Sequence, residues 1–277
     1  MKYKLVDMSW KEAGEAFKKS DTVIVPTGTL HAHGPTPIGI DATAAERLAE
    51  EVGVRTHLLV LPVVAYGEDD KMSGYPGSIG ISPHTLELYY TDICMNLRRN
   101  GIKKVIFING HGGNREVLLR TGYKMRKYGM IIAVLEWWSL GVELGFFKKD
   151  AEFLEEFKIG LAIHGKEAAD LRKGTFKGEW GTHLCKQVLG NKIKTDIFYL
   201  SKFRKGTVMI PMDAWDTDLT SPPYVKNSDL QKLETGGKEL IAKLADYIAE
   251  FAREFQKLNV KRVTSGGRND FTLAQDL

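Results

Sequence analysis

Three histidines of this chain lie in short glycine-containing segments, each of which follows an apolar run. His31 and His33 form a His-x-His pair in the segment GTLHAHGP, and His111 lies in the segment NGHGGN. Asp41 follows His33 by eight residues, at the start of an expected helix. Imidazoles and carboxylates are suitable ligands for zinc, iron or manganese, and glycines let the backbone pass close to a ligand. The spacing therefore indicates a metal site.

Four apolar runs and the helical segments between them must position these side chains. The predicted buried parallel strands are residues 21–26 (DTVIVP), 57–64 (HLLVLPVV), 103–109 (KKVIFIN) and 130–135 (MIIAVL). The predicted helices are residues 41–52, with Asp41 as N-cap, 82–100, 115–128, the charged segment 148–173, and a long amphipathic helix within 229–258. This alternation predicts an α/β fold with a mainly parallel sheet. Ligands bind beyond the carboxyl ends of such strands, so both histidine segments are expected at one edge.

The chain shows no linker and no internal repeat, so we expect one domain over residues 1–258 and a C-terminal extension over 259–277. The long loop at residues 65–81 is rich in Gly, Asp and Ser. Loops of that length are uncommon in a compact domain unless they carry function.

Composition excludes several functional classes. The 277 residues carry a formal net charge of +4, so we expect no nucleic-acid partner. The two cysteines, Cys94 and Cys185, are too few for a disulfide framework and are typical of a reducing compartment. No signal-peptide core and no apolar run of membrane-spanning length is present, so we expect a cytoplasmic protein without a membrane partner.

Other interpretations of the same motifs exist. The NGHGGN turn could bind phosphate at a helix N-terminus, in a nucleotide-binding domain without metal. His31 and His33 could be solvated loop residues. Each alternative is about as good as the metal interpretation when one motif is taken alone. The two motifs together favour the metal, because the predicted sheet places them side by side.

The motifs resemble those of the creatininase family of metal-dependent amidohydrolases. Its members carry Gly-Ser/Thr-x-Glu-x-His-Gly-Pro, an Asp that opens a helix, and later Asn-Gly-His-Gly-Gly-Asn, which are similar to the segments around His33, Asp41 and His111. The YPGS segment at Tyr75 and the Glu-Trp pair at Trp137 also resemble family features. The resemblance covers residues 20–245 and implies a three-layer αβα sandwich with a mainly parallel central sheet.

The resemblance also implies two divalent ions per chain, with zinc first and manganese or iron as alternatives. Asp41 would bridge the ions, His33 would bind one, and His31 and His111 would bind the other. Some members have a carboxylate two residues after the motif histidine, where this chain has Gly113.

Glu179 is the candidate for that missing ligand, with a role as general base as the alternative. His183 is a weaker candidate for the general acid. Asn114 is a candidate for orienting His111 or the substrate.

Trp137 and Tyr75 are the predicted substrate contacts, although core packing explains Trp137 equally well. The chain departs from the family at His31, where members usually have Glu, and at Met72, where many have His. These changes favour a substrate other than creatinine.

We therefore expect hydrolysis of a carbonyl in a small polar, cyclic substrate by a hydroxide that bridges the ions. Ring opening of a keto-inositol or keto-sugar by C–C hydrolysis is an alternative. A degenerate, non-catalytic member that binds a metal or ligand is another. Family resemblance also implies a homo-oligomer, commonly a hexamer.

Overall fold

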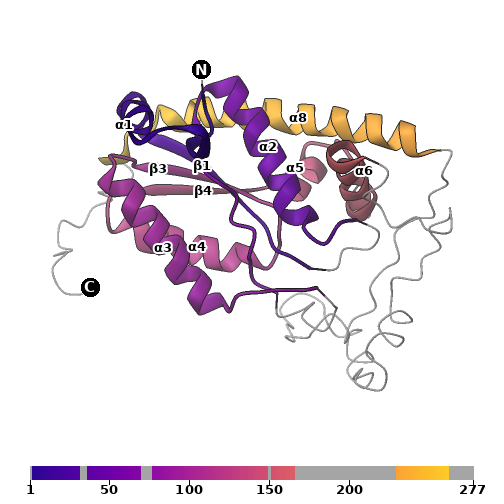
Figure 1. The fold of residues 1–277 in the computed structure, drawn as a ribbon, viewed down its shortest axis with the longest axis horizontal. Helices are drawn as coiled ribbons and strands as arrows, with labels where there is room; N and C mark the ends of the chain where they lie inside the picture. The colour runs from indigo at the N-terminus through magenta and orange to yellow at the C-terminus, as the bar shows by residue number, and fades with distance from the viewer. Residues whose placement is uncertain (1, 32–35, 70–76, 149–150, 166–228, 262–277) are drawn as a thin grey trace.

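The computed structural model describes residues 2–31, 36–69, 77–148, 151–165 and 229–261 (Figure 1). In chain order the elements are η1 (Leu5–Asp7), α1 (Trp10–Lys19), β1 (Thr22–Thr27), α2 (Ile40–Thr56), β2 (Leu59–Val60), α3 (Pro83–Arg99), β3 (Lys104–Asn109), α4 (Asn114–Arg126), β4 (Ile131–Glu136), α5 (Trp137–Glu143), α6 (Glu152–His164) and α8 (Leu230–Gln256). Strands and helices alternate over most of this order, as the sequence predicts for an α/β fold.

The four strands form one parallel sheet in the order β2-β1-β3-β4. The carboxyl ends of β1 and β3 are aligned, because Thr27 pairs with Asn109. The strand predicted over residues 57–64 is shorter than expected and keeps only Leu59–Val60. Leu61 still donates to the carbonyl of Ile24, but the next bond to β1 comes from Val64, three residues on, to the carbonyl of Pro26. Pro26 has no N–H to donate in return, so the ladder between β1 and β2 is interrupted there. A single bridge between Thr27 and Val64 resumes the pairing.

Alternate side chains of the strands enter two separate cores. Ile24, Ile106 and Ile108 pack with α2 and α8 on one face of the sheet. Val25 and Phe107 pack with α3 and α4 on the other face. Burial on both faces explains the uninterrupted apolar runs of the strands and produces the three layers visible in Figure 1.

The long helix α8 lies across the face of the sheet that α2 also covers (Figure 1). It buries Leu240, Leu244, Ile248 and Phe255, which recur at helical spacing. The amphipathic helix predicted from these positions is therefore confirmed.

Two helices were not predicted, although one carries a sequence signal. Helix α1 begins after a capping box in which Ser9 accepts from the backbone N–H of Glu12, and the Glu12 carboxylate accepts from the N–H of Ser9. Helix α5 begins at Trp137 directly after β4, with no intervening turn residues to mark it.

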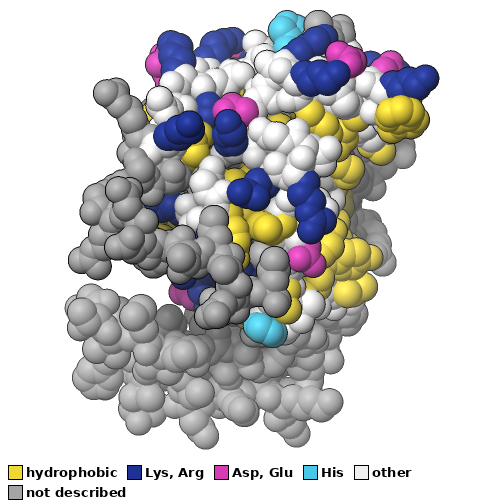
Figure 2. Space-filling view, turned by 90° about the vertical axis from the view of Figure 1, so that its left-hand side faces the viewer, with side chains coloured by type: hydrophobic (Ala, Val, Ile, Leu, Met, Phe, Trp, Pro, Cys, Tyr) yellow, Lys and Arg dark blue, Asp and Glu magenta, His cyan; other side chains and the backbone are white. Residues whose placement is uncertain are grey.

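Figure 2 shows the side of the molecule that is on the left in Figure 1, where Lys and Arg side chains are interspersed with acidic and apolar ones. Among the described helices, none is both long enough and apolar enough to cross a membrane.

Candidate metal centre

Asp41 lies at the centre of the candidate site. It is the second residue of α2, after Gly39 as N-cap, so the prediction of Asp41 as N-cap is wrong. Its side chain is 0% exposed, and the partial positive charge of the helix N-terminus favours a carboxylate there.

Two glycines bring the segments after β1 and β3 against this first turn. A Cβ on Gly28 would lie 2.3 Å from the backbone nitrogen of Ala42, and a Cβ on Gly110 would lie 1.9 Å from the carbonyl oxygen of Asp41. Because the obstructing atoms are backbone, no larger residue fits at either position. The glycines of both motifs therefore set the distance between the two histidine segments and Asp41.

His31 and His111 approach the same oxygen of Asp41. Nε2 of His31 lies 3.0 Å from Oδ2 of Asp41, and Nδ1 of His111 lies 2.9 Å from it. The two rings are perpendicular, with centroids 4.6 Å apart. One ligand atom from each of the three residues lies within 4.8 Å of the others. The parallel sheet thus brings together side chains that are up to eighty residues apart in sequence, as the sequence predicts.

Two acidic residues of the loop after β2 lie behind the imidazoles. Oδ1 of Asp69 is 3.1 Å from Nδ1 of His31, and Oε2 of Glu68 is 3.9 Å from Nε2 of His111. Each ring therefore has Asp41 at one nitrogen and a loop carboxylate at the other. Sequence reasoning marked the loop as functional but missed both residues. The run of three acids at residues 68–70 of a long loop was the only signal for them.

Asn114 ties this loop to the loop after β1. Its Oδ1 accepts from the backbone N–H of Glu68 at 3.0 Å, and its Nδ2 donates to the carbonyl of Gly28 at 3.0 Å. Longer contacts of 3.4 Å reach Thr27 and Asn109. The described contacts of this buried amide give it a positioning role for the two loops that carry His31 and Glu68.

The charges around His31 favour its protonated form in the absence of metal. Burial disfavours the charged imidazole, but hydrogen bonds to Asp41 and Asp69 outweigh that cost and raise the pKa of His31 to about 9. At neutral pH the metal-free site therefore holds a cation between two carboxylates. A divalent ion bound to His31 would have to displace this proton.

The donor set fits a divalent transition metal. Two imidazole nitrogens and a carboxylate oxygen converge, and Asp69 can hold the Nδ1–H of His31 so that Nε2 faces Asp41. A carboxylate behind a histidine ligand is the usual arrangement around protein-bound metals.

The other predicted site residues fall into two groups. His33, Tyr75, Glu179 and His183 lie outside the described residues, so their predicted roles stay predictions. Trp137 lies in the core, 2% exposed, against Trp138 and Phe147, in keeping with the core-packing alternative. The next residue, Trp138, comes nearer to the site, because its Cζ2 would lie 3.9 Å from a Cβ on Gly112.

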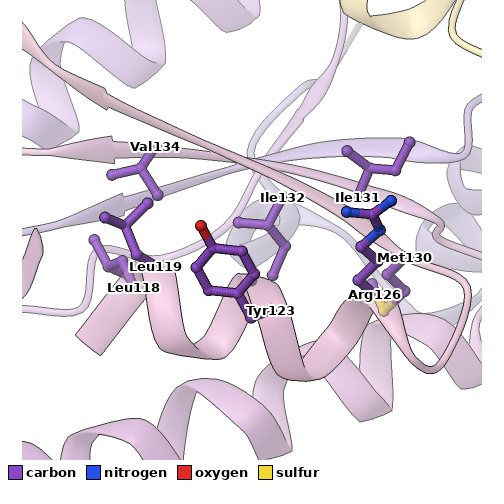
Figure 3. Close-up of a pocket in the computed structure, with 9 residues that line it drawn as sticks. Leu118, Leu119, Tyr123, Arg126, Met130, Ile131, Ile132 and Val134 are labelled. Carbon is purple, nitrogen blue, oxygen red and sulfur yellow. The ribbon is translucent and has the colours of Figure 1, made fainter. Parts of the chain in front are cut away.

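A surface hollow of about 260 Å³ lies elsewhere, between α4 and the first part of β4 (Figure 3). Leu119, Tyr123 and Ile132 are among its mostly apolar lining. No residue of the cluster around Asp41 lines it. We therefore place the chemistry at the carboxyl ends of the strands and not in this hollow.

Comparison with known proteins identifies the family to which the chain belongs. The family model for creatinine amidohydrolase, named Creatininase, matches residues 6–169, which is more than half of the chain and includes every residue of the cluster. The chain belongs to the creatininase family. The resemblance inferred from the two motifs is therefore confirmed.

Relatives within the family differ in what their names describe. The chain is 31% identical over 107 residues to 3-dehydro-scyllo-inosose hydrolase of Thermotoga maritima, across 38% of this chain and 34% of that protein. It is 34% identical over 114 residues to the mycofactocin precursor peptide peptidase of Mycolicibacterium smegmatis, across 39% and 46%. The matched segments thus span less than half of these curated relatives.

The fold likeness extends further than the sequence likeness. A crystal structure of creatinine amidohydrolase (creatininase) superimposes with a TM-score of 0.66 at 19% identity, over 93% of this chain and 99% of that one. This similarity confirms the creatininase-like αβα fold.

Proposed function

We propose that this member of the creatininase family is a metal-dependent hydrolase that attacks a carbonyl of a small polar, cyclic substrate. The convergence of His31 and His111 on one oxygen of Asp41 carries the proposal. These three residues come from the family's two motifs and are buried at the carboxyl ends of parallel strands. Family membership supports the reaction class.

The proposed cofactor is a pair of divalent ions, with zinc first and manganese or iron as alternatives. Two solved creatininases of similar fold are described as "Zn-Zn type" and "Creatininase Mn". The proposed ligands are His31, His33, Asp41, His111 and Glu179. Bound there, the ions supply an activated water near neutral pH and polarise the carbonyl oxygen of the substrate.

The chain's own residues prepare this site in three ways. Asp41 presents one oxygen to both imidazoles, so the ligands are held in place before any ion binds. Asp69 accepts from Nδ1 of His31 and leaves Nε2 directed at Asp41. His183 is the proposed group for moving a proton to the leaving atom, and a role as general base is the alternative to the ligand role of Glu179.

A second candidate reaction is the ring-opening C–C hydrolysis of a keto-inositol. The similarity to 3-dehydro-scyllo-inosose hydrolase favours it. Both reactions place an activated water on a carbonyl carbon, so the same ligand cluster serves either substrate. The third alternative, a member that binds metal without turnover, predicts the same ions and no product.

The test combines metal content with turnover. Full-length protein purified without added metal or chelator is analysed for elements beside Asp41→Asn and a matched surface control, Asp92→Asn. Asp92 is exposed on α3, far in sequence from both motifs. We expect about two ions per chain in the wild type and the control, and loss of metal in Asp41→Asn.

The same three proteins are then assayed on cyclic amides, formamides and keto-inositols. Metal-dependent turnover of one class by the wild type and the control, but not by Asp41→Asn, supports the hydrolase. A wild type that takes up no zinc, manganese or iron on titration overturns it. Full metal content without turnover of any of the three classes replaces the proposal with the non-catalytic alternative.

A further inference from the structure

The space in front of Gly113 is filled by a carboxylate from a different segment of the chain. A Cβ at this position would lie 1.9 Å from Oε2 and 3.1 Å from Cδ of Glu68. The backbone of Gly113 is helical, with φ −61° and ψ −29°, so conformation does not require glycine there. The room that a side chain would use at this position is instead occupied by the carboxylate of Glu68 and by Nε2 of His111, which a Cβ would meet at 2.5 Å.

Glu68 and Asp41 approach opposite nitrogens of the same imidazole. Oε2 of Glu68 lies 3.9 Å from Nε2 of His111, which is longer than a hydrogen bond. Metal–ligand bonds to nitrogen and oxygen are ~2.0–2.2 Å long, so two ligand atoms of one ion are roughly 3–4 Å apart. The distance between Glu68 and His111 therefore suits a shared ion.

The position of Glu68 is fixed by its neighbours. A Cβ on Gly67 would lie 2.3 Å from the carbonyl oxygen of Gly28 and 2.6 Å from Oδ1 of Asn114, so only glycine allows this approach. The N–H of Glu68 is held by Asn114, and the carbonyl of Gly67 accepts from Ile81 at 2.7 Å. These contacts hold the loop so that the carboxylate of Glu68 lies beside His111.

Burial is compatible with such a role. The side chain of Glu68 is only 12% exposed, and a divalent ion at the adjacent imidazole would lower the cost of holding its carboxylate away from water.

We propose that Glu68 is a metal ligand of this site and provides the carboxylate that position 113 does not. This inference rests on the proposed metal-dependent function and deepens it. Glu68 then takes the role for which sequence reasoning selected Glu179. The neighbouring Asp69 has a different role. Its hydrogen bond to Nδ1 of His31 positions the imidazole, so that the imidazole and not Asp69 binds the ion.

Metal titration of four full-length proteins tests the assignment. Metal-free wild type, Glu68→Gln, Asp69→Asn and Glu179→Gln are titrated with zinc and with manganese by calorimetry, and bound metal is counted after dialysis. Glu68→Gln should bind one ion fewer per chain than the wild type. Asp69→Asn should keep the wild-type number with ~10–100-fold weaker affinity, as expected for a residue that orients a ligand. Glu179→Gln should keep the wild-type number.

A glycine pair repeats the test without changing any acid. A Cβ at Gly113 would lie 1.9 Å from Oε2 of Glu68 and 2.5 Å from Nε2 of His111, so Gly113→Ala should displace both groups and lower the metal number at least as much as Glu68→Gln does. Gly112→Ala should not, because its Cβ would meet only Cζ2 of Trp138 at 3.9 Å, an ordinary contact. Circular dichroism and denaturation of each metal-free variant check that the fold is kept.

The outcomes separate this inference from the proposed function. A wild type that binds ions, together with a Glu68→Gln protein of unchanged number and affinity, overturns the role of Glu68 and leaves the hydrolase standing. Loss of an ion in Glu179→Gln but not in Glu68→Gln does the same. A wild type that binds no ion overturns both.

Discussion

Replacing the buried Asn114 by Ala should destabilise the protein much more than replacing an exposed asparagine. The amide is buried and joins two loops through main-chain partners. Its Oδ1 accepts from the N–H of Glu68, and its Nδ2 donates to the carbonyl of Gly28, both at 3.0 Å. The Ala variant deprives both backbone groups of these bonds.

The magnitude follows from the cost of such unsatisfied groups. A buried polar group without its partner costs about 1–3 kcal/mol, so two give about 2–6 kcal/mol. The segment at Glu68 is only partly buried, and water can reach its N–H in part. We therefore expect a loss of about 2–4 kcal/mol in the free energy of unfolding. For a chain of this size that corresponds to a fall in Tm of roughly 4–16 °C.

Urea denaturation of the metal-free protein measures this loss without a contribution from bound ions. The matched control is Asn96→Ala, because Asn96 is exposed on α3, where its side chain donates to the carbonyl of Asp92 and accepts from the exposed Arg99. The control should stay within about 0.5 kcal/mol of the wild type. An Asn114→Ala protein as stable as Asn96→Ala would show that the two loops hold their positions without the amide.

Two further perturbations test the packing and the charge of the site. Gly110→Ala places a Cβ 1.9 Å from the carbonyl oxygen of Asp41, so it should cost about 1–3 kcal/mol or more in denaturation. In contrast, Gly122→Ala, whose Cβ would meet Ile132 at 3.6 Å, should be neutral or stabilising. Equal changes in unfolding free energy for the two variants would refute the close approach of Gly110 to Asp41. In the metal-free protein, the pKa of His31 is raised from 6.5 to about 9, so its stabilising effect is complete below pH ~6.5 and is lost as pH rises to about 9. The difference in unfolding free energy between wild type and His31→Gln should therefore shrink from pH 6 to pH 9.5, and a difference that grows over this range would contradict the raised pKa.

The fold was predictable where burial leaves a strong pattern. Strands covered on both faces must be apolar throughout, and β1, β3 and β4 therefore lie within one or two residues of the predicted runs. The helix predicted over residues 82–100 is present as α3, and its Cys94 is fully buried. The prediction failed where local chemistry competes with the pattern. Opposite Pro26 the pairing with β1 is interrupted, which leaves β2 short, and at Trp137 a helix follows a strand without a turn signal.

The site was predictable in the part that the sheet positions. His31, Asp41 and His111 follow strands whose ends are in register, so topology alone brings their segments together. Glu68 and Asp69 belong to a loop without periodicity, and no sequence rule fixes its path. Its path depends on the close approach of Gly67 to Gly28, which only the folded structure shows.

The acids of that loop bear on whether the site still has a function. The family motif has Glu where this chain has His31, and some members have a carboxylate where this chain has Gly113. Each departure removes a negative charge from a centre that would hold divalent cations. Glu68 and Asp69 bring two carboxylates back, one beside each imidazole. Asp69 also has a charged partner without metal, because a protonated His31 lies between it and Asp41. Glu68 differs, because its Oε2 is 3.9 Å from Nε2 of His111, a separation that suits a shared ion better than a hydrogen bond. Of the two acids, Glu68 therefore gives the stronger support to a rebuilt metal centre over a degenerate one.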